Sequence, residues 1–162
     1  MENMTSTKPV TAISSSQLLE HYQGHRRLTR RMLEAFPEEH FFHYSVGGMR
    51  PIAAMAMEFI NMTRMGVTGV ATHNWQTVGK KEQPATKQAI LDLWDENTQL
   101  INEYWPQITE ERFQETDKAF GMYEGVVYSL MLYIIDNEIH HRGEMYVYFR
   151  SLGLEPVPFY ER

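Results

Sequence analysis

The chain of 162 residues contains no cysteine, and this absence excludes several kinds of site. Without a thiol group there is no disulfide bond, no thiolate ligand for a metal ion and no cysteine nucleophile. Positive charge is also scarce, because 15 Lys and Arg stand against 21 Asp and Glu and leave a formal net charge of −6. Nucleic-acid binding needs a basic surface, so we expect no nucleic-acid partner.

Long apolar runs are missing as well. No run approaches the roughly 18 residues of a membrane-spanning helix, and the first residues lack the charged-then-apolar pattern of a secretion signal. We therefore expect a soluble cytoplasmic protein with no membrane partner. Residues 1–13 are polar and are expected to form a flexible N-terminus. Residues 14–162 are expected to form one domain, since this length suffices for a full hydrophobic core.

Four segments carry apolar residues at helical spacing. The first begins after Ser14, a residue type that favours helix N-caps, and the second begins at Pro51. The third opens at Pro84, and the last and longest covers about residues 121–152. Residues 67–83 are expected to form a long connector over the end of the bundle or the mouth of a pocket. Four such helices predict an all-α four-helix bundle.

The last of these segments carries the most informative polar residues. At 100° per residue, Glu138 and His141 lie on its apolar face and Asn137 lies at the edge of that face. His140 and Glu144 are expected to point away. A carboxylate, an imidazole and an amide on an apolar face are costly unless they find partners. This stretch is therefore where we expect a functional site.

The spacing differs by one residue from a known metal-binding pattern. In the HExxH arrangement, two histidines four residues apart on one helix face share a metal ion, and the glutamate acts as general base. Here Asn137 replaces the first histidine and Glu138 and His141 keep their positions. An asparagine carbonyl is a weaker ligand for zinc or nickel than an imidazole. From the helix alone, a hydrogen-bonded cluster without an ion is the alternative.

Three polar residues on the earlier helices, Glu58, His21 and His25, lie on or near apolar faces. Glu58 lies within the apolar second segment and has no Lys or Arg four residues away, so it needs a partner elsewhere or solvent. His21 and His25 lie one helical turn apart near an apolar stripe. They form either a chelating pair or, as is more common, half-buried histidines with hydrogen-bond partners.

These residues resemble a known family. The sequence NEIHHRGE at residues 137–144, followed by Leu152-Gly153 and Pro156, resembles the closing signature of the DinB-like family, which usually reads HExHHRGQ before a Leu-Gly and prolines. Gly48-Met49-Arg50 also resembles the approach to the second helix in that family. Family members are four-helix bundles, often homodimers, in which three histidines hold a divalent metal.

Carried over by position, the resemblance implies Glu58, Asn137 and His141 as the metal ligands. Only one of the three is a histidine. The resemblance implies zinc, nickel, manganese or iron as the ion, and a set with two oxygen ligands suits harder ions such as manganese or iron(II) better than three histidines do. A metal-free cluster in which these three side chains bond to one another remains the alternative. The resemblance also implies a homodimer.

The resemblance implies a metal-dependent enzyme, either an S-transferase that uses a low-molecular-weight thiol or a hydrolase, acting on a small-molecule substrate. The metal would lower the pKa of a bound thiol or water. Glu138 would be the catalytic proton-transfer residue, or else a buried carboxylate bonded to a neighbouring helix. The alternative function is a catalytically silent dimer that binds a small molecule or is associated with stress, and that has lost the metal site.

Overall fold

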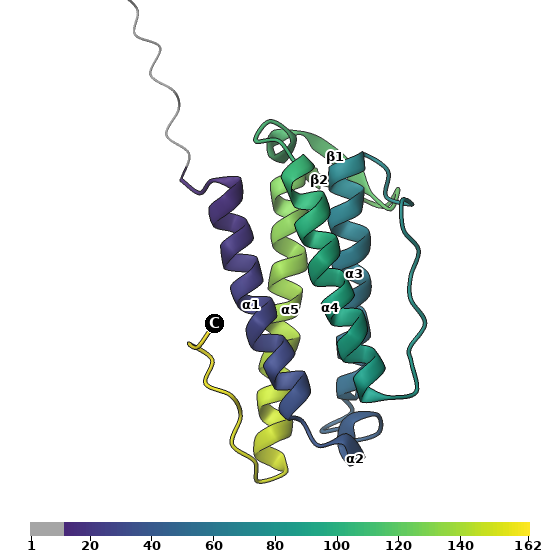
Figure 1. Ribbon diagram of the computed structural model, residues 1–162, viewed down its shortest axis with the longest axis vertical. Coiled ribbons are helices and arrows are strands. Elements are labelled where there is room, and N and C mark those ends of the chain that lie inside the picture. The colour runs from purple at the N-terminus through teal and green to yellow at the C-terminus, as the bar shows by residue number, and fades with distance from the viewer. Residues whose placement is uncertain (1–11) are drawn as a thin grey trace, which may run out of the picture.

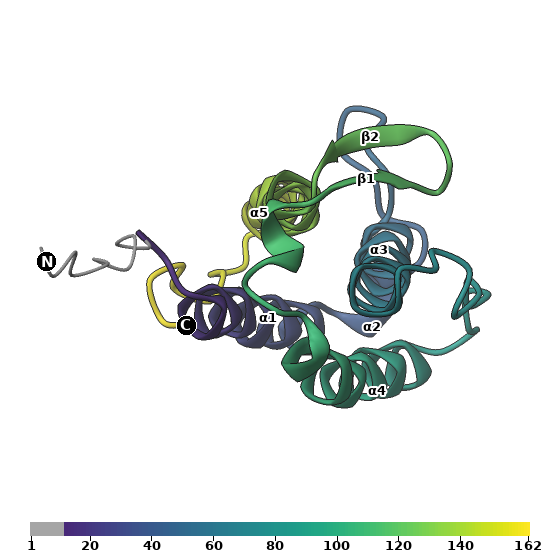
Figure 2. The same ribbon diagram turned by 90° about the horizontal axis from the view of Figure 1, so that it is seen from above.

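The computed structural model describes residues 12–162, so the expected flexible N-terminus lies almost entirely outside the described residues. Four long helices pack side by side as a bundle (Figures 1 and 2). These helices are α1 (Ser15–Ala35), α3 (Ile52–Thr72), α4 (Lys87–Tyr104) and α5 (Val127–Ser151). The predicted all-α four-helix bundle is confirmed, and α5, with 25 residues, is the longest of the four helices. No helix among residues 12–162 is long and apolar enough to span a membrane.

The first helix begins where the sequence predicts. The Ser14 hydroxyl accepts a hydrogen bond from the Gln17 backbone N–H at 3.2 Å, and the Gln17 side chain accepts one from the Ser14 backbone N–H at 2.9 Å. This reciprocal capping box satisfies two N–H groups that have no partner within the helix. Below α1, the short helix α2 (Glu38–Phe41) leads into the turn before α3.

The connector after α3 differs from the expectation. The predicted end of this helix before residue 67 was wrong, because α3 continues to Thr72 and buries Val67 and Val70 completely. Helices α3 and α4 run in the same direction, so residues 73–86 return along the length of α3 (Figure 1). The Lys81 backbone N–H donates to Asn61 Oδ1 at 2.8 Å, which fastens the connector to the side of α3.

The predicted start of the last helix at residue 121 was also wrong. Residues before α5 form a hairpin in which β1 (Thr116–Ala119) pairs antiparallel with β2 (Tyr123–Val126). Phe120 and Gly121 join the strands with φ values of 56° and 69°, a left-handed conformation that a right-handed helix cannot contain. Two 3-10 turns, η1 (Trp105–Gln107) and η2 (Arg112–Gln114), connect α4 to this hairpin.

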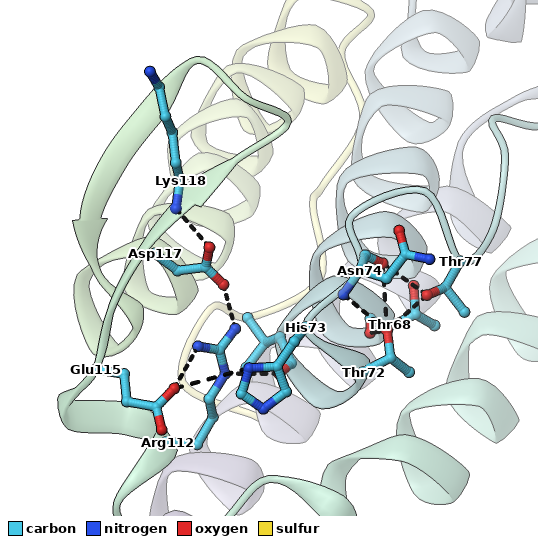
Figure 3. Close-up of polar contacts among 10 residues, drawn as sticks. Thr68, Thr72, His73, Asn74, Thr77, Arg112, Glu115, Asp117 and Lys118 are labelled. Atoms are coloured by element: carbon cyan, nitrogen blue, oxygen red, sulfur yellow. Dashed lines mark hydrogen bonds and ion pairs between the residues drawn. The ribbon is translucent and has the colours of Figure 1, made fainter.

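A buried arginine holds the hairpin to the end of α3 (Figure 3). The Arg112 Nε donates to the Val70 carbonyl at 2.9 Å, and its two terminal nitrogens contact Glu115 and Asp117. His73, which ends α3 in a left-handed conformation, lies 3.9 Å from the Glu115 carboxylate. Because Arg112 is almost fully buried, these partners are what make its charge tolerable there.

The bundle interior contains two apolar clusters, one at each end. One cluster surrounds Phe36, Phe59 and Trp94, and the other surrounds Tyr22 and Trp105. Buried polar side chains lie between these two apolar clusters. All four long helices contribute to this layer. It consists of His25, Arg26, Thr29, Thr63, Arg64, Asn97, Glu138 and Arg142. We refer to these eight residues as the polar layer.

Glu138 joins α5 to α1 within the polar layer. Thr29 Oγ1 donates to Glu138 Oε1 at 2.6 Å, and Arg142 Nη1 lies 3.8 Å from the same oxygen. Arg142 also donates to His25 Nδ1 at 2.9 Å. Burial raises the pKa of Glu138, although Arg26, Thr29 and Arg142 oppose the rise. These contacts fix the rotation of α5 relative to α1, because a small rotation would leave the buried groups without partners.

Replacement of Gly69 by alanine tests the close approach of the connector to α3. A Cβ atom there would lie 2.5 Å from Trp75 Cε3 and 3.2 Å from Trp75 Cα. We expect Gly69→Ala to lower the free energy of unfolding by about 1–2 kcal/mol, since overpacking outweighs the gain in helix propensity. Gly143→Ala is the matched control, because Gly143 is exposed in α5 with no atom within 4 Å of its Cβ position. Gly143→Ala should raise the free energy of unfolding, measured in urea, by about 0.5–1 kcal/mol. Equal effects of the two changes would contradict this packing.

Acid should weaken the polar layer through His25. Burial, with the charges of Arg142, Arg162 and His21, lowers the pKa of His25 from 6.5 to about 4. A histidine with a lowered folded-state pKa contributes stability that is complete above pH 6.5 and is lost as the pH falls toward 4. His25→Gln keeps an acceptor for Arg142 but cannot titrate. We expect its loss of stability between about pH 7 and pH 5 to be smaller than that of the wild type, in urea unfolding at several pH values.

His43→Gln is the control for this experiment, because His43 is exposed in the turn before α3. It should keep the acid sensitivity of the wild type. If His25→Gln and the wild type lose stability in parallel, His25 does not couple the polar layer to pH.

Candidate functional site

Glu58, Asn137 and His141 contact one another between α3 and α5. These two helices lie beside each other in the bundle (Figures 1 and 2). Asn137 Nδ2 donates to Glu58 Oε1 at 2.9 Å, and His141 Nε2 lies 3.4 Å from the same oxygen. The three positions come from two helices, since Asn137 and His141 are one turn apart on α5 and Glu58 faces them from α3. The structure therefore brings together the three residues that the sequence singled out.

A fourth residue, Arg50, completes this cluster from the loop before α3. Its guanidinium contacts Glu58 Oε2 through Nη1 and lies 3.2 Å from His141 Nε2 through Nη2. Gly47 and Gly48, with φ values of 58° and 80°, form the turn that brings the chain back to this point. Tyr148 donates to the Arg50 carbonyl at 2.7 Å and holds the backbone in place. We refer to Arg50, Glu58, Asn137 and His141 as the Arg50 cluster.

The contacts of His141 determine which of its nitrogens carries the proton. Arginine can only donate, so the hydrogen bond from Arg50 requires a lone pair on Nε2. The proton then lies on Nδ1, which is 2.8 Å from Glu144 Oε2 and donates to it. His141 is therefore oriented by a carboxylate on one side and presents a lone pair on the other. This is the arrangement by which proteins commonly fix a metal-binding histidine.

The side-chain oxygen atoms of Glu58 and Asn137 differ in their partners. Partial burial raises the pKa of Glu58, but hydrogen bonds from Arg50 and Asn137 and the positive charge of Arg50 outweigh this effect and leave the pKa below its ordinary value. Asn137 Oδ1 is buried and has no hydrogen-bond partner in the described part of the chain, residues 12–162. An acceptor of this kind is costly to bury alone. The cluster thus offers a carboxylate, an imidazole lone pair and an unpartnered carbonyl oxygen to a cation.

Two members of the site were not identified from the sequence. Glu144 was expected to point away, yet it reaches His141 from one helical turn later, and the spacing of three residues was the available signal. Arg50 is eight residues from Glu58, and no helical spacing connects a loop residue to a helix. His140 is exposed, as expected, and its Nε2 lies 3.7 Å from Glu144 Oε1. His140, His141 and Glu144 together form a second group with ligand atoms within 4.8 Å of one another.

Glu138 and the His21–His25 pair occupy other places. The Glu138 side chain is only 2% exposed and faces α1, where it accepts from Thr29. It belongs to the polar layer and not to the Arg50 cluster. The rings of His21 and His25 lie edge to face with centroids 4.6 Å apart, and His25 Nδ1 already accepts from Arg142. His25 therefore matches the hydrogen-bonded histidine of the alternative interpretation, whereas His21 is exposed.

Comparison with known proteins agrees with this architecture. The uncharacterized protein YjoA of Bacillus subtilis (strain 168) is 26% identical over 153 residues, which cover 91% of this chain and 97% of that protein. The crystal structure of this DinB-like protein from Bacillus subtilis superposes with a TM-score of 0.71 at 21% identity and covers 90% of this chain and 99% of its own. The crystal structure of a DinB-like protein from Bacillus cereus also gives a TM-score of 0.71, at 17% identity, over 88% of this chain and 95% of its own.

At such identities the two crystal structures establish a shared fold alone. A sequence model of the DinB family matches residues 1–162, the whole length of the chain. The protein is therefore a member of the DinB family.

Proposed function

We propose that this protein binds a divalent metal ion through Glu58, Asn137 and His141 and uses it in a reaction on a small molecule. The observation that carries the proposal is the buried Asn137 Oδ1, which has no hydrogen-bond partner among residues 12–162. It belongs to the amide whose Nδ2 donates to Glu58 Oε1, and that carboxylate oxygen lies 3.4 Å from His141 Nε2. A metal ion would satisfy this oxygen and hold the other two ligands.

The chemistry of the donor set fits such an ion. Two oxygen donors and one imidazole suit manganese, iron(II) or zinc, which accept mixed oxygen and nitrogen ligands. Three protein ligands also leave coordination positions open, as in catalytic metal sites. Glu144 supports the fit, since its hydrogen bond to Nδ1 keeps Nε2 of His141 available. The donor set of Glu58, Asn137 and His141 therefore fits any of these three ions.

The reaction class that we propose is transfer to or from a low-molecular-weight thiol, or hydrolysis. When bound, the metal would supply a thiolate or hydroxide nucleophile at neutral pH by lowering the pKa of its ligand. The residues of the chain then have separate tasks: Glu58, Asn137 and His141 position the ion, and Glu144 orients His141. Glu138 faces α1, so in this proposal it holds two helices together and does not transfer a proton at the site.

A second candidate is a catalytically silent protein that binds a small molecule. One observation favours it: Arg50 and Asn137 together already neutralise Glu58 by charge and hydrogen bonds. In such a protein the Arg50 cluster would connect α3, α5 and the preceding loop without an ion. Metal titration separates the two candidates.

Substitutions at the site should change the shift in melting temperature that a metal ion causes. A ligand that binds only the folded state raises the melting temperature. We expect manganese or zinc to raise the melting temperature of tag-free wild type. His141→Ala should abolish the shift, and His140→Ala, at an exposed neighbour, should keep it. Asn137→His should increase the shift with zinc, because it places two imidazoles one turn apart on one face.

Melting curves recorded without metal show how much His141→Ala changes the stability of the protein by itself. Without metal, His141→Ala leaves the partners of the imidazole unsatisfied and should cost roughly 1–3 kcal/mol in unfolding free energy. If neither the wild type nor Asn137→His responds to manganese or zinc, the metal site is rejected and the silent protein is favoured. If His140→Ala loses the response as His141→Ala does, the ion is held by the neighbouring group that contains Glu144 instead.

We further propose a homodimer. Large apolar side chains are exposed on β2 and on the outer side of α5, among them Tyr123, Tyr133 and Val147, and exposed apolar surface often serves association. Light scattering of micromolar protein should give about twice the chain mass of 19.1 kDa. Tyr133→Glu should shift the mass toward that of the single chain. A wild-type mass equal to one chain would reject the dimer.

A further inference from the structure

Arg50 contacts two of the three proposed metal ligands. Its guanidinium is bonded to Glu58 and to the Nε2 lone pair of His141, and both groups are among the ligands assigned to the ion. A lone pair that accepts a hydrogen bond from arginine cannot bind a metal ion at the same time. The guanidinium and the ion are therefore competitors for the same two side chains.

The side chain of Arg50 is able to leave while its backbone stays. It is 45% exposed, whereas those of Glu58 and His141 are 26% and 16% exposed. The backbone is held by the hydrogen bond from Tyr148 to the Arg50 carbonyl, and Pro51 follows at the start of α3. Only side-chain rotation is needed to free the ligands, so the helices need not move.

The exchange also makes the site more positive. With Arg50 in place, its positive charge is paired with Glu58, and a second carboxylate, Glu144, lies on the other side of His141. A divalent ion adds two positive charges, and the displaced guanidinium then lacks a carboxylate partner at the mouth of the site. A bidentate donor beside a metal ion recognises carboxylate or phosphate groups.

From these contacts we infer that Arg50 exchanges partners: it neutralises Glu58 without metal, and it binds an anionic group of the substrate when a divalent ion displaces it. This inference rests on the proposed metal site and adds the substrate class to it, a small molecule that carries a carboxylate or phosphate. Arg50 is thus a specificity residue that also lowers the affinity for metal.

The first test measures manganese affinity by calorimetry in the wild type and in Arg50→Lys and Arg50→Gln. We expect Arg50→Gln to bind manganese about tenfold more tightly, because the ion no longer breaks charged hydrogen bonds. Arg50→Lys keeps the charge but cannot bridge Glu58 and His141 as a planar fork does, so it should also bind more tightly than wild type. Arg150→Gln removes one exposed positive charge from the end of α5 and should leave the affinity unchanged.

The second test uses sodium formate as the anionic probe and melting temperature as the readout. With manganese bound, formate should stabilise the wild type beyond manganese alone, and this increment should be absent in Arg50→Gln. Without manganese, formate should stabilise neither protein, because Arg50 is engaged with Glu58 in the wild type and is missing in Arg50→Gln. An equal increment in both proteins would show that formate binds the ion alone and would overturn the assignment of Arg50.

The outcomes distinguish this inference from the proposed function. If the wild type binds manganese and both Arg50 variants bind it equally well, the metal site stands and the exchange is rejected. If Arg50→Lys equals wild type and only Arg50→Gln gains affinity, Arg50 acts through charge at a distance and the exchange is again rejected. If neither Arg50→Gln nor Asn137→His binds manganese, both proposals fail.

Discussion

The polar layer is the constraint on which the rest of the bundle depends. All four long helices bury charged or amide groups at the same height, between an apolar cluster at each end. Apolar side chains tolerate small rotations and shifts of their helices. Removal of the partner of a buried charge, in contrast, lowers the stability of the fold by several kcal/mol. Glu138 and Arg142 can meet Thr29 and His25 in one relative position of α5 and α1. The layer therefore sets the rotation of α5.

That rotation determines where the candidate site lies. The neighbours of the buried residues on α5 turn toward α3, so Asn137 lies opposite Glu58 because Glu138 lies opposite Thr29. One stretch of helix thus serves two sides of the bundle, with a structural pair facing α1 and candidate ligands facing α3. The loop through Gly47 and Gly48 then places the positively charged side chain of Arg50 against Glu58.

The sequence predicted the bundle and the meeting of Glu58, Asn137 and His141, because helical periodicity and the family signature both report which side chains share a face. It did not predict the hairpin before α5, since the left-handed turn at Phe120 and Gly121 interrupts an apolar run that reads equally well as helix. Arg50 was also missed. Its place depends on how a loop closes on two helices, and no local spacing encodes such a contact.

We propose that the Arg50 cluster is a cation site, which the Arg50 guanidinium fills and which is open to a divalent ion. Anomalous diffraction from crystals grown with manganese tests it most directly. We expect a peak about 2.0–2.3 Å from Glu58, Asn137 Oδ1 and His141 Nε2, with the Arg50 side chain displaced from Glu58. A peak bound by His140 and Glu144, or no peak with Arg50 still on Glu58, would contradict it.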